Sequence, residues 1–165
     1  MVIIDSLHRS PMQEILADLQ TYRDGIEKAK NLLLGNLVLL GEIPSPTFHE
    51  ENRVQKFAEI TARAGLQSCT VDEVSNGTAV LPGKNEQAGN ILVVAHADTS
   101  FSENVDHSIS LCEDRVCGPG VADNSLGVAV LASLPELVEK LGLEFNHNLR
   151  SEERRVGKEC IVKCR

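Results

Sequence analysis

The stretch NILVVAHAD, residues 90–98, joins an unbroken apolar run to a histidine and a carboxylate. The run Ile91–Ala95 is apolar at every position rather than alternating, a pattern typical of a strand that is covered on both faces. His96 and Asp98 follow directly, and residues two apart on an extended chain point to the same side. The stretch therefore predicts a buried strand that presents an imidazole and a carboxylate together at its carboxyl end.

A second stretch, GPGVADNSLG at residues 118–127, places Asp123 in a glycine-flanked turn. A helical pattern follows from Asn124 to Leu141. The glycines would let the backbone pass close to a bound ligand and let the helix pack tightly. We therefore expect Asp123 to sit in a turn at the start of a helix.

The remaining sequence alternates between helical and extended patterns. These patterns predict helices at 11–40 and 50–64, strands at 68–74, 78–81 and 90–95, and a hairpin formed by 108–112 and 115–117. Such alternation is typical of an α/β domain, and we expect a three-layer α/β/α arrangement around a mixed, mostly parallel sheet. Ligands collect outside the carboxyl ends of strands in open sheets of this class, so His96, Asp98 and Asp123 are expected to meet there.

Composition limits the classes of function. The chain has 165 residues, of which 42% are hydrophobic, enough for one domain with a real core. Its net charge of −8 argues against a surface for nucleic acid or anionic membrane. We see neither an apolar run of membrane-spanning length nor a secretory signal at the start. Five cysteines at no repeating spacing do not form a disulfide framework, so we expect a reduced, cytoplasmic protein.

The three polar residues have the chemistry of a metal site. Zinc binds histidine nitrogen and carboxylate oxygen at about 2.0–2.2 Å and keeps one position open for water at catalytic sites. His96 supplies a nitrogen, and Asp98 can reach its ring and fix the tautomer. Asp123 has two oxygens and could bridge two metal ions about 3.5–4 Å apart. The predicted metal ligands are therefore His96 and Asp123, with Asp98 as the catalytic residue that orients the imidazole.

Each residue alone has a plainer interpretation. A histidine at the end of a strand is more often a hydrogen-bonded structural residue, Asp123 could be a helix N-cap, and Asp98 could be a turn residue. An unrelated α/β binding domain with a chance His-x-Asp would place the three residues far apart. The joint pattern favours the metal site.

Residues 40–141 resemble the N-terminal half of the di-zinc amidohydrolase and metallopeptidase family that includes aminoacylase, carboxypeptidase G, peptidase T and acetylornithine deacetylase. The similar parts are GEIPSP at residues 41–46, the helix at 50–64, His96-x-Asp98 and the Asp123 loop. The co-catalytic zinc aminopeptidases have a similar Asp-Asn-x-x-Gly loop.

This resemblance implies a hydrolase that cleaves amide bonds of peptides or N-acyl amino acids with two zinc ions, or with cobalt or manganese in their place. His96 would bind one ion, Asp98 would orient His96, and Asp123 would bridge both ions. The resemblance also implies a cis peptide bond at Asp123-Asn124 and a possible homodimer of the intact protein.

The chain departs from the family pattern after residue 141. The family next has a buried strand that ends in Glu-Glu, and Glu152-Glu153 is a candidate for this pair. We reject it on sequence grounds, because residues 146–151 do not read as a strand that could be buried. The string from Arg150 to Cys160 instead resembles the in-frame translation of a sequencing-adapter oligonucleotide.

We therefore expect two parts: residues 1–149 as a partial N-terminal portion of a metallopeptidase catalytic domain, and residues 150–165 as a non-native tail. Such a fragment lacks part of its ligand shell, so we expect little or no hydrolase activity from it. The alternative is a non-catalytic remnant that binds a metal or a partner. Three further expectations concern side chains: Cys160 and Cys164 carry no metal, Cys112 and Cys117 are reduced, and His107 is a solvated loop residue.

Overall fold

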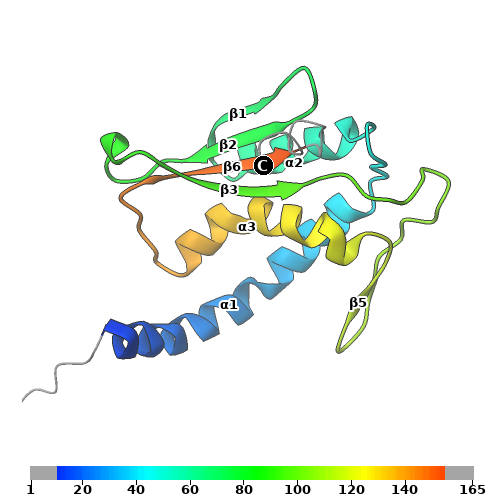
Figure 1. The fold of residues 1–165 in the computed structure, drawn as a ribbon. Coiled ribbons are helices and arrows are strands. Elements are labelled where there is room, and N and C mark those ends of the chain that lie inside the picture. Colours follow the sequence, from blue (N-terminus) through cyan, green and yellow to red (C-terminus); the bar gives the residue numbers. More distant parts are fainter. Residues whose placement is uncertain (1–10, 155–165) are drawn as a thin grey trace, which may run out of the picture.

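The computed structural model describes residues 11–154 of the chain, apart from some side chains within that range. Within the described residues, three helices and six strands follow one another as in Figure 1, together with a short 3₁₀ turn (Glu86–Ala88) and a kinked turn (Val121–Ser125) in which Asp123 and Asn124 do not have helical backbone angles. Their bounds are α1 Pro11–Gly41, α2 Glu51–Arg63, β1 Gln67–Val71, β2 Gly77–Leu81, β3 Asn90–His96, β4 Ser110–Leu111, β5 Val116–Cys117, α3 Leu126–Lys140 and β6 Asn148–Arg154. All of the helices and strands predicted from the sequence pattern are present within a few residues.

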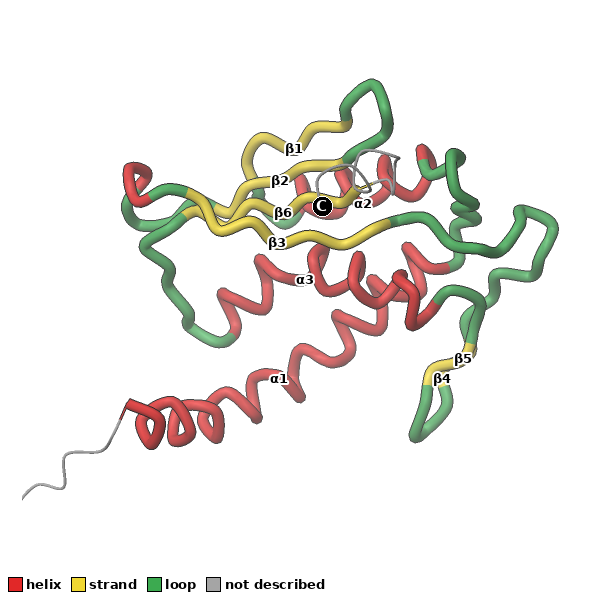
Figure 2. Tube along the Cα trace, viewed as in Figure 1, coloured by secondary structure: helices red, strands yellow, loops and turns green. Residues whose placement is uncertain are grey.

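Four strands form one sheet in the order β1-β2-β6-β3, and β4 pairs with β5 in a separate hairpin (Figure 2). The α/β class and the mixed sheet are confirmed. The prediction of a mostly parallel sheet is wrong, because β1–β2 and β2–β6 are antiparallel and β3–β6 alone is parallel. The connections explain this difference: the short link between β1 and β2 permits an antiparallel hairpin, whereas β3 and β6 are joined through the crossover helix α3.

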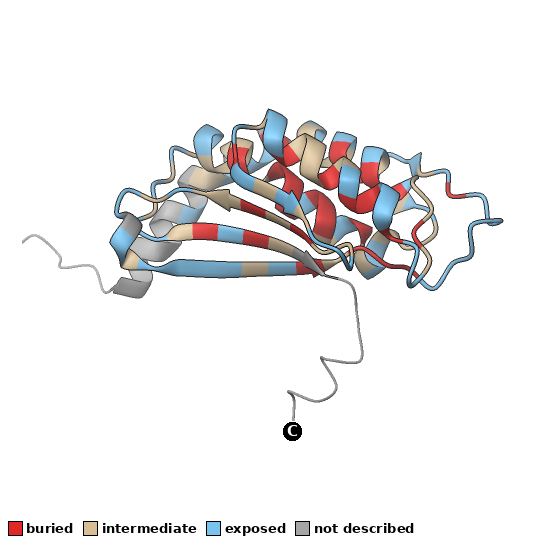
Figure 3. Cartoon of the chain, turned by 90° about the horizontal axis from the view of Figure 1, so that it is seen from above, coloured by how far each residue is buried: buried red, intermediate tan, exposed pale blue. Residues whose placement is uncertain are grey.

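The helices cover one face of the sheet (Figure 3). A buried cluster joins α1, α2, α3 and β3, and consists of Leu40, Phe57, Ala95, Val128, Leu131 and Ala132. On the opposite face, Leu92 and Val94 are 50% and 49% exposed. The second helical layer that a three-layer domain requires is therefore not found within residues 11–154.

Strand β3 lies at an edge of the sheet rather than in its middle. The prediction that Ile91–Ala95 is covered on both faces is wrong, because Leu92 and Val94, on the face away from the helices, are half exposed. Within this strand, Ala95 is buried and Val93 packs against the core cluster. The apolar run identified the strand correctly, but the run could not show how many neighbouring elements cover it.

Strand β6 lies between β2 and β3, which corrects the view that residues 146–151 do not form a buried strand. Leu149 and Ser151 are 5% and 1% exposed. A central strand needs only every second side chain to face the core, and its backbone groups pair with neighbours on both sides. Two small or apolar residues in alternate positions are therefore sufficient here, although the segment as a whole is polar.

Helix α3 and the turn before it, Val121–Lys140, are long and apolar enough to cross a membrane by length and composition alone, with a mean hydropathy of 1.3. This differs from the expectation that no segment reaches that length. In this fold the helix packs against α1 on one side and β3 on the other, and 44% of the apolar window is buried. Its composition matches that of a helix covered by other elements.

Candidate metal site

The end of β3 and the turn before α3 meet at one edge of the sheet. His96 is the last residue of β3, and Asp123 lies in the turn Val121–Ser125. The chain after His96 runs beside the loop that follows α1, where the Thr99 amide donates to the Ser45 carbonyl at 2.8 Å. This arrangement places three separate segments around His96.

His96 lies between two carboxylates. Its Nδ1 is 3.0 Å from Asp98 Oδ1, and its Nε2 is 3.0 Å from Asp123 Oδ1. Asp98 is held in turn by the Thr47 hydroxyl, which donates to Oδ2 at 2.8 Å. The structure thus brings the three predicted residues into direct contact, which contradicts the alternative of a chance motif with its residues far apart.

The number of N–H groups on the His96 ring limits how it can contact both Asp98 and Asp123. A neutral imidazole carries one N–H, so it can donate to only one of the two carboxylates. The other ring nitrogen then turns its lone pair toward a carboxylate oxygen 3.0 Å away. Positive charge at the site, either a second ring proton or a metal cation, removes that repulsion.

The two carboxylates have different access to solvent. The side chain of Asp98 is 12% exposed, that of His96 is 31% exposed and that of Asp123 is 88% exposed. A sheltered carboxylate fixes the ring of His96, while the open side of the ring faces a carboxylate that incoming ions can reach. This difference in solvent exposure is consistent with the predicted roles of Asp98 as the orienting group and of His96 and Asp123 as ligands.

The distances fit two ligands of one ion. Two donors at about 2.0–2.2 Å from a tetrahedral zinc ion lie about 3.4 Å apart. His96 Nε2 and Asp123 Oδ1 are 3.0 Å apart, so a small outward movement would admit the ion. No group of three or more His, Cys, Asp or Glu side chains that could hold a metal occurs among the described residues. Among the described residues, His96 and Asp123 are therefore the candidate ligands.

Glycines make the Asp123 turn possible. Gly120 has a left-handed backbone (φ +64°), and a Cβ there would meet Thr99 Cγ2 at 2.6 Å. A Cβ on Gly127 would overlap the side-chain amide of Asn124. The peptide bond Asp123-Asn124 is cis, as the family resemblance implied.

The pair Glu152-Glu153 is the feature that sequence reasoning dismissed. Because β3 and β6 are parallel and in register, Val94 lies opposite Glu152 and Ala95 opposite Glu153. The backbone therefore brings this pair to the end of the sheet at which β3 finishes with His96. The family pattern places such a pair at the end of a strand, and the pair does lie near the end of β6. The polar composition of residues 146–151 argued against a strand there. The assignment of residues 150–165 as a non-native tail stays a prediction from the sequence.

The loop after Asp98 also differs from expectation at one residue. His107 is 6% exposed, not solvated, and its Nε2 donates to the Ser102 carbonyl at 3.0 Å. The neighbouring Asp106 accepts hydrogen bonds from the hydroxyl and the amide of Ser108, which lower the pKa of its carboxyl. Cys112, which follows β4, and Cys117, which ends β5, are free thiols as expected, whereas Cys160 and Cys164 lie outside the described residues.

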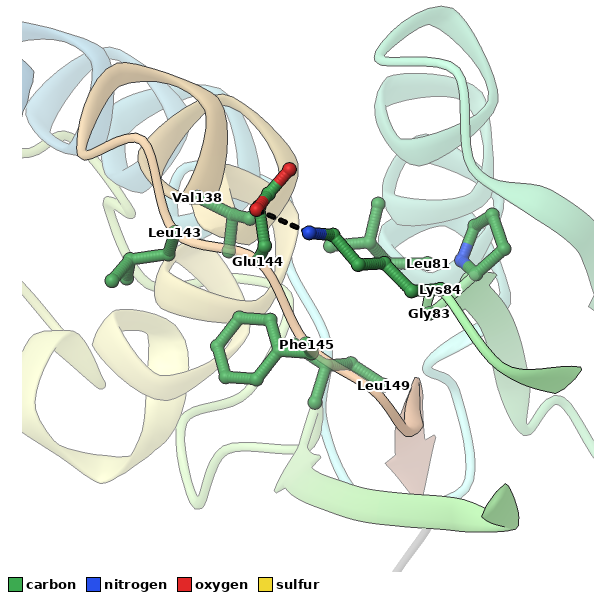
Figure 4. Close-up of a pocket in the computed structure, with 9 residues that line it drawn as sticks. Leu81, Gly83, Lys84, Val138, Leu143, Glu144, Phe145 and Leu149 are labelled. Carbon is green, nitrogen blue, oxygen red and sulfur yellow. Dashed lines mark hydrogen bonds and ion pairs between the residues drawn. The ribbon is translucent and has the colours of Figure 1, made fainter. Parts of the chain in front are cut away.

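A small cavity of about 230 Å³ lies at the other end of the sheet (Figure 4). Leu81, Leu143 and Phe145 supply much of its apolar wall, and Lys84 forms an ion pair with Glu144 beside it. Leu149, where β6 begins, also lines it. The cavity contains no histidine or cysteine, so its chemistry does not resemble that of the His96 site.

No protein-family model matches the sequence, and no curated protein matches it. Solved structures do share its fold. The dipeptidase Dug1p of Saccharomyces cerevisiae aligns over 82% of this chain with a TM-score of 0.68 and 13% identity. Human carnosine dipeptidase 1 aligns over 88% with a TM-score of 0.68 and 14% identity. The YXEP protein of Bacillus subtilis, a dinuclear metal-binding peptidase of the M20 family, aligns over 75% with a TM-score of 0.51 and 16% identity.

The chain spans about a third of the length of these proteins: 34% of Dug1p, 37% of carnosine dipeptidase 1 and 34% of YXEP. At these identities the similarity concerns the fold. The sequence-based resemblance to di-zinc peptidases is confirmed at that level: this chain has the fold found in one part of M20-type peptidases.

Proposed function

We propose that this chain is the N-terminal part of a metal-dependent hydrolase that cleaves amide bonds in peptides or N-acyl amino acids. The contact of His96 with both Asp98 and Asp123 carries the proposal, because a histidine between two carboxylates suits a cation. The similarity in fold to peptidases, one of them dinuclear and metal-binding, supports it. The proposed metal is zinc.

Each residue has a role that follows from its position. Asp98, sheltered and held by Thr47, keeps the His96 ring oriented with Nδ1 toward its own carboxylate. His96 Nε2 and Asp123 would hold the ion on the open side. Bound there, zinc would act as a Lewis acid that polarises an amide carbonyl and lowers the pKa of water.

The described residues supply only two of the ligands such a site needs. We therefore propose that this chain binds one ion weakly and has little or no peptidase activity. A reducing compartment such as the cytoplasm is part of the same proposal, supported by the free thiols of Cys69, Cys112 and Cys117.

Zinc titration by calorimetry tests the proposal. We expect about one ion per chain for the wild type, and no measurable binding after His96→Ala or Asp123→Ala. His147→Ala is the matched control, because His147 is an exposed histidine next to the start of β6, at the other end of the sheet. Equal zinc binding by wild type and His96→Ala would contradict the proposed site. Near-normal aminopeptidase turnover of the wild type that His96→Ala abolishes would contradict the proposed lack of activity.

A further inference from the structure

Arg53 is a fully buried charged side chain at the centre of the loops that form the metal site. It lies in α2 and is 0% exposed. Burial of a guanidinium is costly unless its donors are used. Its Nε and Nη2 donate to the Ile43 carbonyl at 3.1 and 2.5 Å, and Nη2 also reaches the Gly41 carbonyl at 3.2 Å. These contacts fix the plane of the guanidinium against the segment that follows α1.

The remaining terminal nitrogen, Nη1, contacts both segments of the metal site. It donates to the Ala97 carbonyl at 2.8 Å, and Ala97 lies between His96 and Asp98. It also donates to Ser125 Oγ at 3.2 Å, and Ser125 is two residues after Asp123. One nitrogen atom therefore joins the strand end that carries His96 to the turn that carries Asp123.

The shape of the side chain makes this connection specific. A guanidinium is planar and holds its five donors in a fixed fork, whereas a lysine ammonium is a compact charge on a flexible stem. Because Nε and Nη2 are anchored on Ile43, the direction of Nη1 is set. The positions of Ala97 and Ser125 relative to each other follow from that direction.

We infer that Arg53 is a positioning residue that sets the separation between His96 and Asp123. The inference rests on the proposed function for its purpose, but the contact network can be tested without metal. Without Arg53 the two segments would still fold against the sheet, and the spacing of the two ligands would no longer be held. Groups that orient metal ligands in this way change metal affinity about 10–100-fold when removed.

Amide hydrogen exchange of the metal-free protein is the first measurement. The Thr99 amide bonded to Ser45 and the amide of residue 125 bonded to Gly120 report on the two segments. We expect Arg53→Lys to speed exchange at both by about tenfold or more, since hydrogen bonds to a charged group are lost. Ser125→Ala removes only the contact of Arg53 with the Asp123 turn, so exchange should rise at residue 125 and not at Thr99. This second variant keeps the test valid if Arg53→Lys does not fold.

Thr61→Val is the matched control. Thr61 is buried in the same helix, and its hydroxyl donates to the Phe57 and Ala58 carbonyls of α2. This variant should lower stability without changing exchange at Thr99 or residue 125.

Zinc titration of the same variants is the second measurement, with an expected loss of about 10–100-fold in affinity for Arg53→Lys and none for Thr61→Val. Wild-type exchange in both Arg53→Lys and Ser125→Ala would overturn the inference. An equal effect of Thr61→Val would also overturn it, because Arg53 would then act on stability alone. If the wild type binds no zinc, the proposed function fails while the exchange results still decide the role of Arg53.

Discussion

The geometry around His96 separates the roles of two aspartates that look alike in the sequence. Asp98 and Asp123 each contact one nitrogen of the same ring at 3.0 Å. Asp98 has a second partner in Thr47, whereas Asp123 is open to solvent. The spacing His96-x-Asp98 predicted the first contact, because side chains two apart on an extended chain share a side. The second contact depends on how a distant turn packs.

Asp98→Asn tests whether Asp98 orients the ring of His96. The amide can place its NH₂ group toward Nδ1 and favour the other tautomer, so the ring would lose its lone pair on the side of Asp123. We expect zinc affinity to fall about 10–100-fold in calorimetric titration. Thr47→Val, which removes only the hydroxyl on Asp98 Oδ2, should cause a smaller loss. Unchanged affinity in Asp98→Asn would show that Asp98 does not orient the ring.

At the scale of elements, α3 packs against the core cluster, and the turn before it, Val121–Ser125, carries Asp123. Leu131 and Val128 of α3 face the sheet and are 2% and 0% exposed, while Val130 between them is 38% exposed. The helical period in the sequence predicted this face correctly. The strands were harder to interpret, because β3 is apolar but lies at an edge, and β6 is polar but lies inside the sheet.

Leu131→Ala and Leu126→Ala compare the buried and exposed faces of α3 with one substitution. Leu131 belongs to the core cluster, and Leu126 is 41% exposed at the start of the helix. We expect Leu131→Ala to lower the free energy of unfolding by about 2–5 kcal/mol through lost burial and a cavity. Leu126→Ala should cost about 1 kcal/mol or less. Urea denaturation followed by circular dichroism measures both, and equal losses would contradict the assigned core.

For the whole molecule, one face of the sheet and the edge formed by β3 are uncovered within the described residues. Strand β3, Asn90–His96, contains no Lys, Arg, Asp, Glu or Pro, the residues that commonly protect an edge strand. Ile91, Leu92 and Val94 of this strand are 44–50% exposed. An apolar edge of this kind favours association between chains.

Val94→Lys places a charge on this edge and should raise the solubility of the chain. We expect the variant to show less light scattering than the wild type as concentration rises, with a free energy of unfolding within about 0.5 kcal/mol. Val105→Lys, at a loop valine that is 39% exposed, is the control for added charge alone. Equal improvement by both variants would show that the edge of β3 is not the site of association.

The sequence by itself determined the elements and half of the site. Periodicity located the helices, turn residues bounded the strands, and the spacing of His96 and Asp98 fixed one contact, because these features depend on residues near one another in the chain. Tertiary structure alone decided the order of strands, the uncovered face of β3 and the central place of β6, and it set the direct contact between His96 and Asp123, which the sequence had placed only in the same region. Those features depend on which distant segments pair, and pairing is set by burial and backbone hydrogen bonds summed over the whole fold.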